Sequence, residues 1–170
     1  MKKELNLLIA MVFIWCSVII ATPLMVSYGV FGSVTAHFFY KFFHTICHQF
    51  ESRSFHINDH PFAVCIRCSS IYAGFFVALL AIRFINKFQK ESDSFFHHKR
   101  IMKLILIAFP MFIDAMVDTF NIIPSSTLSR IITGGWFGLG MAVVLQSSLT
   151  DIIHYIFSLK LFTFYDAKTR

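Results

Sequence analysis

The amino-acid sequence predicts an all-α integral membrane protein, a bundle of four transmembrane helices plus a short interfacial helix in the first outer loop. Of the 170 residues, 56% are hydrophobic and only 14% are charged, whereas charged residues make up about 25% of a typical soluble domain. The chain also has 22 Phe residues, a side chain that is favourable at the centre of a bilayer. The length suits one compact bundle, so we expect a single membrane domain over residues 1–170.

Four apolar stretches are long enough to cross a bilayer, which takes about 20 residues of α-helix. The first follows Met1-Lys2-Lys3 and contains Pro23, where a kink is expected. Its apolar run is longer than the core of a secretory signal peptide, about 7–15 residues, so we expect an uncleaved span. The predicted spans cover about residues 5–30, 69–85, 101–123 and 131–149.

Basic residues are distributed unequally between the two sides of this predicted bundle. One side holds both termini and a Lys- and Arg-rich loop from Arg83 to Lys103. The other side holds only Lys41, Arg53, Arg67 and Arg130. Because Lys and Arg favour the cytoplasmic side, we expect both termini in the cytoplasm, the loop 31–68 outside it, and the chain in the inner (cytoplasmic) membrane. Topology thus accounts for the net charge of +6, and nucleic acid is not expected as a partner.

The outer loop is predicted to begin with a helix lying on the bilayer surface. Residues 37–48 mix aromatic and polar side chains at roughly helical spacing, which is typical of an interfacial helix. His44 and His48 are four residues apart and would share a face of that helix.

The same loop contains three of the four cysteines, in Cys47-His48 and Cys65-Ile66-Arg67-Cys68. We expect Cys65 and Cys68 in the first turn of the second span, where the helix dipole favours thiolates. Sulfur and imidazole nitrogen are zinc ligands, and Cys₃His is a common tetrahedral set. The pattern therefore predicts a site for zinc or another transition metal, formed by Cys47, His48, Cys65 and Cys68. The fourth cysteine, Cys16, is expected to pack inside the first span.

Two other interpretations of the cysteines stay open. Cys65 and Cys68 have the spacing of a dithiol, and the outer face is oxidising in most organisms. The chain could then be a membrane thiol–disulfide oxidoreductase in which Cys47 exchanges with one of the pair. It could equally be a non-catalytic accessory or transport component whose cysteines form a structural disulfide.

A second polar group is predicted at the same membrane face. Asp114 and Asp118 lie four residues apart on the third span and would share a face of it. Carboxylates inside a membrane are costly and mark a functional site or an ion pair. Arg130, at the start of the fourth span, is the expected partner. The three form either a salt bridge between helices or a catalytic pocket, in which a carboxylate is a general base or a metal ligand and Arg130 holds an anionic group.

Small residues and hydroxyl residues are predicted to shape the fourth span. Ser125-Ser126-Thr127 supplies candidates for its N-cap. Thr133-Gly134-Gly135, Gly138 and Gly140 give it small faces, and Gly74 does the same for the second span. Such faces allow close approach of helix backbones in membranes.

Several short motifs resemble those of the bacterial and archaeal membrane proteins grouped as domain of unknown function 2085. The family pattern reads roughly Cys-His-Gln, Arg-Ser-Phe, Cys-x-Arg-Cys and Gly-Ile-Tyr-x-Gly. The matching residues here are Cys47-His48-Gln49, Arg53-Ser54-Phe55, Cys65-Ile66-Arg67-Cys68 and Ile71-Tyr72-Ala73-Gly74. Asp114, Arg130 and Thr133-Gly134 resemble the second half of the family, so the resemblance covers about residues 40–140. The chain departs from the pattern at Ser70 and at Asn58-Asp59, where glycines are expected. The family has no established activity, so the resemblance groups these residues but implies no reaction.

The residues together predict a multi-pass membrane protein with an outward-facing metal site beside an Asp/Arg pocket. As an enzyme, it would carry out a metal-assisted reaction on a lipid, a lipid headgroup or another small anionic substrate. Whether Cys47 meets Cys65 depends on the path of the loop between them.

Overall fold

The computed structural model describes residues 2–26, 30–88, 100–120 and 126–146, which are mostly helical. The helices are α1 (Lys2–Val26), α2 (Val30–His44), α3 (Ile66–Phe88), α4 (Arg100–Thr119) and a last helix at Thr127–Gln146. The loop between α2 and α3 contains a 3₁₀ turn, η1 (Glu51–Arg53), and the strands β1 (His56–Ile57) and β2 (His60–Pro61).

Three helices are long and apolar enough to cross a membrane: Leu5–Val26, Ile66–Ile85 and Thr127–Gln146. They correspond to the first, second and fourth predicted spans. The third predicted span corresponds to α4, which has 20 residues but carries charged residues near both ends. A helical protein with membrane-length helices is thus confirmed, whereas four crossings remain a prediction. The parts of the predicted spans at 27–29, 121–123 and 147–149 lie outside the described residues.

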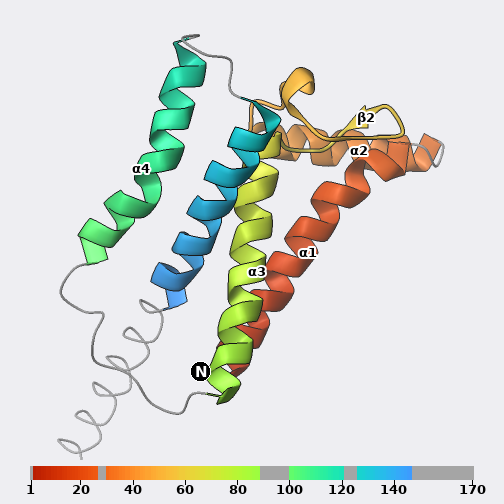
Figure 1. The fold of residues 1–170 in the computed structure, drawn as a ribbon. Helices are drawn as coiled ribbons and strands as arrows, with labels where there is room; N and C mark the ends of the chain where they lie inside the picture. Colours follow the sequence, from red (N-terminus) through yellow and green to blue (C-terminus); the bar gives the residue numbers. More distant parts are fainter. Residues whose placement is uncertain (1, 27–29, 89–99, 121–125, 147–170) are drawn as a thin grey trace, which may run out of the picture.

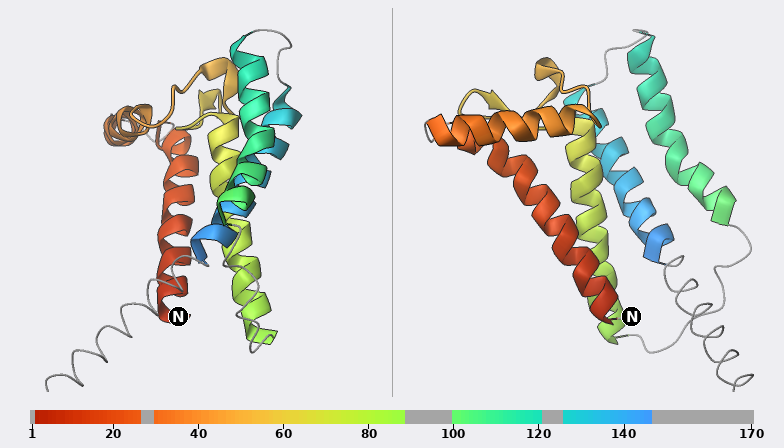
Figure 2. Two further views of the ribbon diagram at one scale, coloured as in Figure 1. Left: turned by 90° about the vertical axis from the view of Figure 1, so that its left-hand side faces the viewer. Right: turned by 180° about the vertical axis from the view of Figure 1, so that it is seen from behind.

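α1, α3 and the last helix run together, α4 stands beside the last helix, and α2 lies across one end of the group (Figures 1 and 2). That end, called the α2 end below, holds the C-terminal ends of α1 and α4. The N-terminal ends of α3 and the last helix lie there too, together with the loop between α2 and α3. Because the helices run in alternating directions, four helix ends lie beside one polar loop.

α2 begins and ends earlier than the sequence indicates. The first predicted span reaches residue 30, but α1 ends at Val26 and α2 already begins at Val30. The predicted interfacial helix reaches His48, but α2 ends at His44. The N–H of Cys47 still donates to the carbonyl of Phe43 at 2.9 Å, and Gln49 then has a φ of 50°, a left-handed conformation that cannot continue a helix. His44 and His48 consequently do not share a helical face.

Aromatic packing fixes α2 across α1 and α3. The Trp15 ring of α1 meets Phe43 of α2 edge-on, with centroids 5.2 Å apart, and meets Tyr72 of α3 at 5.9 Å. Phe43 is buried, and it forms a core with Ile19 and Val64 at the α2 end. Large apolar side chains on the outer faces of the helices stay exposed, such as Leu106 at 70%. Exposed apolar surface of this extent suits a lipid environment.

Glycines let α3 and the last helix touch along their backbones. A Cβ added to Gly74 would lie 2.5 Å from the carbonyl oxygen of Gly135, and one added to Gly134 would lie 2.7 Å from that of Arg67. One added to Gly138 would collide with the carbonyl group of Ile71. These contacts are the close approach that the small residues predict.

Replacing Gly138 by Ala should therefore destabilise the protein. The new methyl group would meet the α3 backbone, with the amide nitrogen of Phe75 only 2.9 Å away, and backbone cannot move aside as a side chain can. We expect a loss of about 1–3 kcal/mol, typical of overpacking, measured as a lower unfolding midpoint in detergent. Gly135→Ala is the matched control, because a Cβ there meets nothing within 4 Å. Equal midpoints for the two variants would contradict the close helix contact.

Candidate functional site

The loop between α2 and α3 is held against α2 by side-chain hydrogen bonds to carbonyl groups. The side-chain amide of Gln49 donates to the carbonyl of Tyr40 at 2.9 Å and to that of Ala63 at 2.6 Å. The hydroxyl of Tyr40 donates to the carbonyl of Pro61. Gln49 and Tyr40 therefore join the end of α2 to the segment that leads into Cys65.

A tight hairpin turns the chain back in the middle of this loop. β1 pairs with β2 in antiparallel fashion, His56 opposite Pro61 and Ile57 opposite His60. The turn residues Asn58 and Asp59 have φ values of 50° and 64°. Asn and Asp tolerate this left-handed conformation better than other non-glycine residues, which explains how they serve where the family pattern has glycine.

The result is a group of three thiols at the start of α3. The Sγ atoms of Cys47, Cys65 and Cys68 all lie within 4.8 Å of one another. The carbonyl of Cys65 accepts the N–H of Ser69 at 2.9 Å, so Cys65 occupies the N-cap position of α3 and Cys68 lies in the first turn. The loop therefore does bring Cys47 to Cys65, as the metal-site prediction requires.

Cys47 is the hydrogen-bond acceptor of this group. Hydrogen bonds from the thiol of Cys65, then from that of Cys68 and from the backbone N–H of Cys65, lower the pKa of Cys47 well below its usual range, although burial opposes the shift. The N–H of Cys65 lies 3.2 Å from the Cys47 sulfur. The lowered pKa favours the thiolate form of Cys47, which is the form that binds metal ions.

The three sulfur atoms suit a zinc ion. Zinc binds thiolates at about 2.3 Å in tetrahedral geometry, which places ligand sulfurs about 3.8 Å apart. The three sulfur atoms here lie within 4.8 Å of one another, which is close to that spacing. All four cysteines lie in described residues and are free thiols, and Cys16 lies apart from the group in α1.

His48, the fourth ligand that the sequence predicts, does not join the three sulfurs. Its side chain is exposed, and its ring stacks on that of Phe50 with centroids 5.9 Å apart and an interplanar angle of 8°. It nevertheless lines the same pocket as the cysteines. A role for His48 as a ligand stays a prediction.

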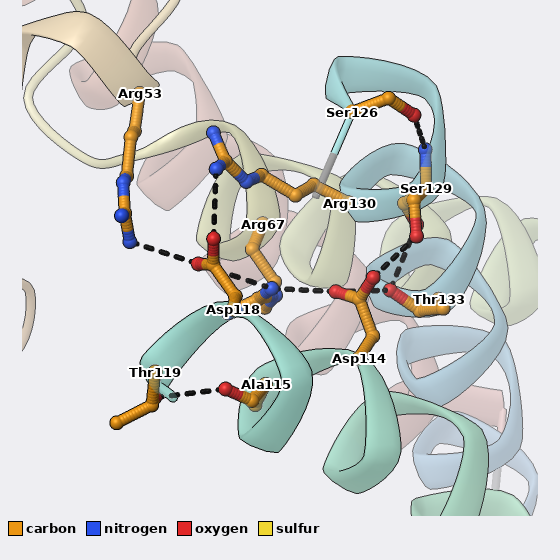
Figure 3. Close-up of polar contacts among 10 residues, drawn as sticks. All are labelled: Arg53, Arg67, Asp114, Ala115, Asp118, Thr119, Ser126, Ser129, Arg130 and Thr133. Atoms are coloured by element: carbon orange, nitrogen blue, oxygen red, sulfur yellow. Dashed lines mark hydrogen bonds and ion pairs between the residues drawn. The ribbon is translucent and has the colours of Figure 1, made fainter. Parts of the chain in front are cut away.

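The carboxylate of Asp118 lies at the centre of a charged group at the α2 end (Figure 3). Asp118 is 6% exposed and pairs with Arg53 at 2.8 Å, Arg130 at 3.2 Å and Arg67 at 3.8 Å. These partners come from η1, the last helix and the first turn of α3, so one acid joins three segments to α4. The predicted pairing of Asp118 with Arg130 is present. Sequence reasoning missed Arg53 as a partner, although the Arg-Ser-Phe motif contained the signal.

Asp114, one turn deeper on α4, has a separate set of partners (Figure 3). Its carboxylate accepts hydrogen bonds from Arg67, from the hydroxyl of Ser129 and, at 3.4 Å, from that of Thr133. The N–H of Ser129 in turn donates to the hydroxyl of Ser126 at 3.1 Å, so a residue of the predicted N-cap segment caps this helix. These contacts favour a structural role for Asp114.

One pocket joins the cysteines to the charged group. It has a volume of about 630 Å³, within the range of small-molecule sites. Its polar lining consists of Cys47, His48, Gln49, Arg53, Cys65, Arg67, Cys68, Asp118, Thr119 and Arg130. Asp114 is not part of this lining. The three cysteines and Asp118 with its arginines, which the sequence predicts at the same membrane face, therefore line one cavity.

Three membrane-length helices with a polar pocket at one end define a helical membrane protein. The chain belongs to the family described as predicted membrane protein (DUF2085), whose model matches residues 47–144. The match begins at Cys47 and includes every residue of the three-thiol group and of the charged group.

Two archaeal relatives are similar to this chain, and both are uncharacterised. A protein of Methanocaldococcus jannaschii is 35% identical over 105 residues, which are 62% of this chain and 63% of the relative. The chain thus matches less than two thirds of that relative's length. A protein of Methanothermobacter thermautotrophicus is 30% identical over 112 residues, 66% of this chain and 95% of the relative. No solved structure matches the chain.

Replacing Asp114 by Asn should destabilise the protein, because the partly buried guanidinium of Arg67 would lose its nearest carboxylate. The two side chains are 18% and 8% exposed. Breaking a fully buried pair costs about 3–5 kcal/mol, and the cost here should be smaller because Arg67 also lies 3.8 Å from Asp118. We expect a lower midpoint of unfolding in detergent. Asp59→Asn is the matched control: Asp59 is exposed, and Asn accepts its left-handed backbone. A midpoint for Asp114→Asn as high as that of the control would show that the pair adds nothing.

Proposed function

We propose that this protein is a multi-pass inner-membrane protein with an extracytoplasmic metal centre held by Cys47, Cys65 and Cys68. The observation that supports the proposal is the convergence of three sulfur atoms within 4.8 Å. A disulfide uses two sulfurs and needs no third. Soft thiolate ligands in a compact group suit zinc or another thiophilic transition metal.

The location of the cysteines favours a reactive metal centre over a purely structural one. Structural zinc sites usually have four protein ligands, whereas catalytic sites have three and leave one position open. Here three cysteines line a pocket of about 630 Å³. His48 lines the same pocket and is the candidate for a fourth ligand. With His48 bound, the centre would be closed and structural.

As an enzyme, the protein would act on a lipid, a lipid headgroup or a small anionic substrate. A bound zinc would supply Lewis-acid chemistry at the pocket wall. Asp118 faces the pocket, where it could hold or accept a proton. Arg130 would hold an anionic group, and Asp114 would position Arg67 behind it. A role for Asp114 in proton transfer, which the sequence suggests, has less support because Asp114 does not line the pocket.

The charge distribution of the chain supports the proposed orientation. Lys41, Arg53, Arg67 and Arg130 belong to the α2 end, and far more basic residues belong to the termini and to the segment from Arg83 to Lys103. Positive residues favour the cytoplasmic side. The α2 end would therefore face outward, with α2 at the depth of the headgroups and the pocket beside it.

Metal analysis of purified protein tests the proposal. We expect about one zinc or other transition-metal ion per chain in protein kept reduced throughout. The content should fall to near zero in Cys47→Ser, Cys65→Ser and Cys68→Ser, because each removes one ligand. Cys16→Ser is the matched control and should keep its metal. His48→Ala separates an open centre, which keeps its metal, from a closed one. Wild-type protein without stoichiometric metal would refute the proposal.

A second candidate function, thiol–disulfide exchange, is favoured by the free thiols of Cys65 and Cys68 beside the Cys47 thiolate. In this function the Cys47 thiolate attacks a disulfide between Cys65 and Cys68 and releases one of them as a thiolate. Trapping of thiols in intact cells distinguishes the two functions. A metal centre predicts that all three cysteines stay reduced when an oxidant is added. A Cys65–Cys68 disulfide that forms and disappears with the redox state would favour exchange.

A further inference from the structure

The lining of the pocket has more positive than negative side chains. Arg53, Arg67 and Arg130 line it, and Asp118 is the carboxylate among its lining residues. Before the cysteines and any metal are counted, these groups sum to a charge of about +2. A pocket with walls of one sign concentrates ligands of the opposite sign. The charge therefore predicts an anionic ligand.

Arg53 has donors to spare. A guanidinium group carries five N–H donors and no acceptor, and Arg53 uses Nη1 for its hydrogen bond to Asp118 at 2.8 Å. Its carbon Cζ also lies 5.5 Å from the centre of the Phe50 ring. Among the residues that the structure describes, these are the polar and cation–π contacts of its side chain. The side chain is 39% exposed and lines the pocket.

Arg53 and Arg130 meet across Asp118 from different segments. Arg53 belongs to η1 in the loop, and Arg130 belongs to the first turn of the last helix. Both guanidinium groups bind the same carboxylate, at its two different oxygens. Arg130 is only 11% exposed and belongs to a helix, whereas Arg53 is more exposed and belongs to the loop.

We propose that Arg53 and Arg130 bind a phosphate-type oxyanion in this pocket, next to the three cysteines. Guanidinium forks match the oxygen spacing of phosphate and can bind it with two parallel hydrogen bonds. A phosphomonoester carries a charge of about −1.5 to −2 at pH 7, opposite in sign to the arginines of the pocket lining. The inference rests on the proposed function, because it names the charged group of that site's ligand. The binding residues, however, are not the metal ligands.

The phosphate group has two potential sources, free phosphate and the headgroup of a lipid. Apolar residues of the pocket lining, Ile46, Phe50, Ile71 and Met111, would border a lipid headgroup as readily as a water-soluble phosphoester. The experiment therefore needs one arm for each source.

In the first arm, detergent-solubilised protein is titrated with inorganic phosphate by calorimetry. In the second arm, protein in nanodiscs of phosphatidylcholine is compared with protein in nanodiscs that also contain phosphatidic acid, and binding is measured as a rise in the unfolding midpoint. We expect saturable binding in at least one arm. The arm that responds identifies the source.

Arg53→Gln should weaken binding about tenfold or more in the responding arm, because a hydrogen bond to a charged group contributes about 1.5–3 kcal/mol. Arg53→Lys keeps the charge but loses the fork, so it should bind with intermediate affinity. Lys41→Gln is the matched control, because Lys41 is an exposed cation of α2 that does not line the pocket. In these variants Asp118 still pairs with Arg130 and Arg67, so the variant proteins should fold.

Metal content is measured on the same preparations to separate this inference from the proposed function. Arg53→Gln should lose the oxyanion and keep the metal, and Cys65→Ser should lose the metal and still bind the oxyanion. Absence of saturable binding in both arms, or unchanged binding in Arg53→Gln, overturns the oxyanion site whatever the metal content. Wild-type protein that binds phosphate but contains no metal would overturn the metal centre alone.

Discussion

The buried charge of Asp118 constrains most of the structure at the α2 end. A carboxylate with 6% exposure is strongly destabilising unless cations lie within reach. Its cations come from η1, α3 and the last helix. These segments are far apart in the sequence, and the charge of Asp118 is neutralised only when all of them pack against α4. The same packing places Arg53 and Arg130 in the lining of the pocket.

The cysteine group depends on a different kind of contact. Cys47 lies beyond the end of α2, and Cys65 lies before the start of α3. They meet because Gln49 and Tyr40 bind carbonyl groups of the returning loop. The positive φ of Gln49 is the local cost of this path. The three-thiol group is therefore a product of loop geometry, whereas the charged group is a product of helix packing.

This difference explains how much the sequence alone could predict. Apolar length identified the helices, and the spacing of Asp114 and Asp118 together with the polarity of Arg130 identified the charged group. The end of α2 and the contact between Cys47 and Cys65 depend on side chains of one segment bonding to the backbone of another, which no periodic pattern records. Arg53 was interpreted as a topology signal, because the Arg-Ser-Phe motif marks this residue but does not identify its distant partner, Asp118.

The glycine contacts between α3 and the last helix affect how the pocket responds to a ligand. Gly134 lies against the carbonyl of Arg67, and its neighbour Thr133 bonds Asp114. With no side chain between them at these glycines, the backbones of the two helices are in direct contact. Arg67 and Arg130 are thus preorganised, and binding of a ligand would cost little conformational entropy at these two side chains. Most of the adaptation to different ligands would fall on Arg53, so the loop rather than the helices would set selectivity.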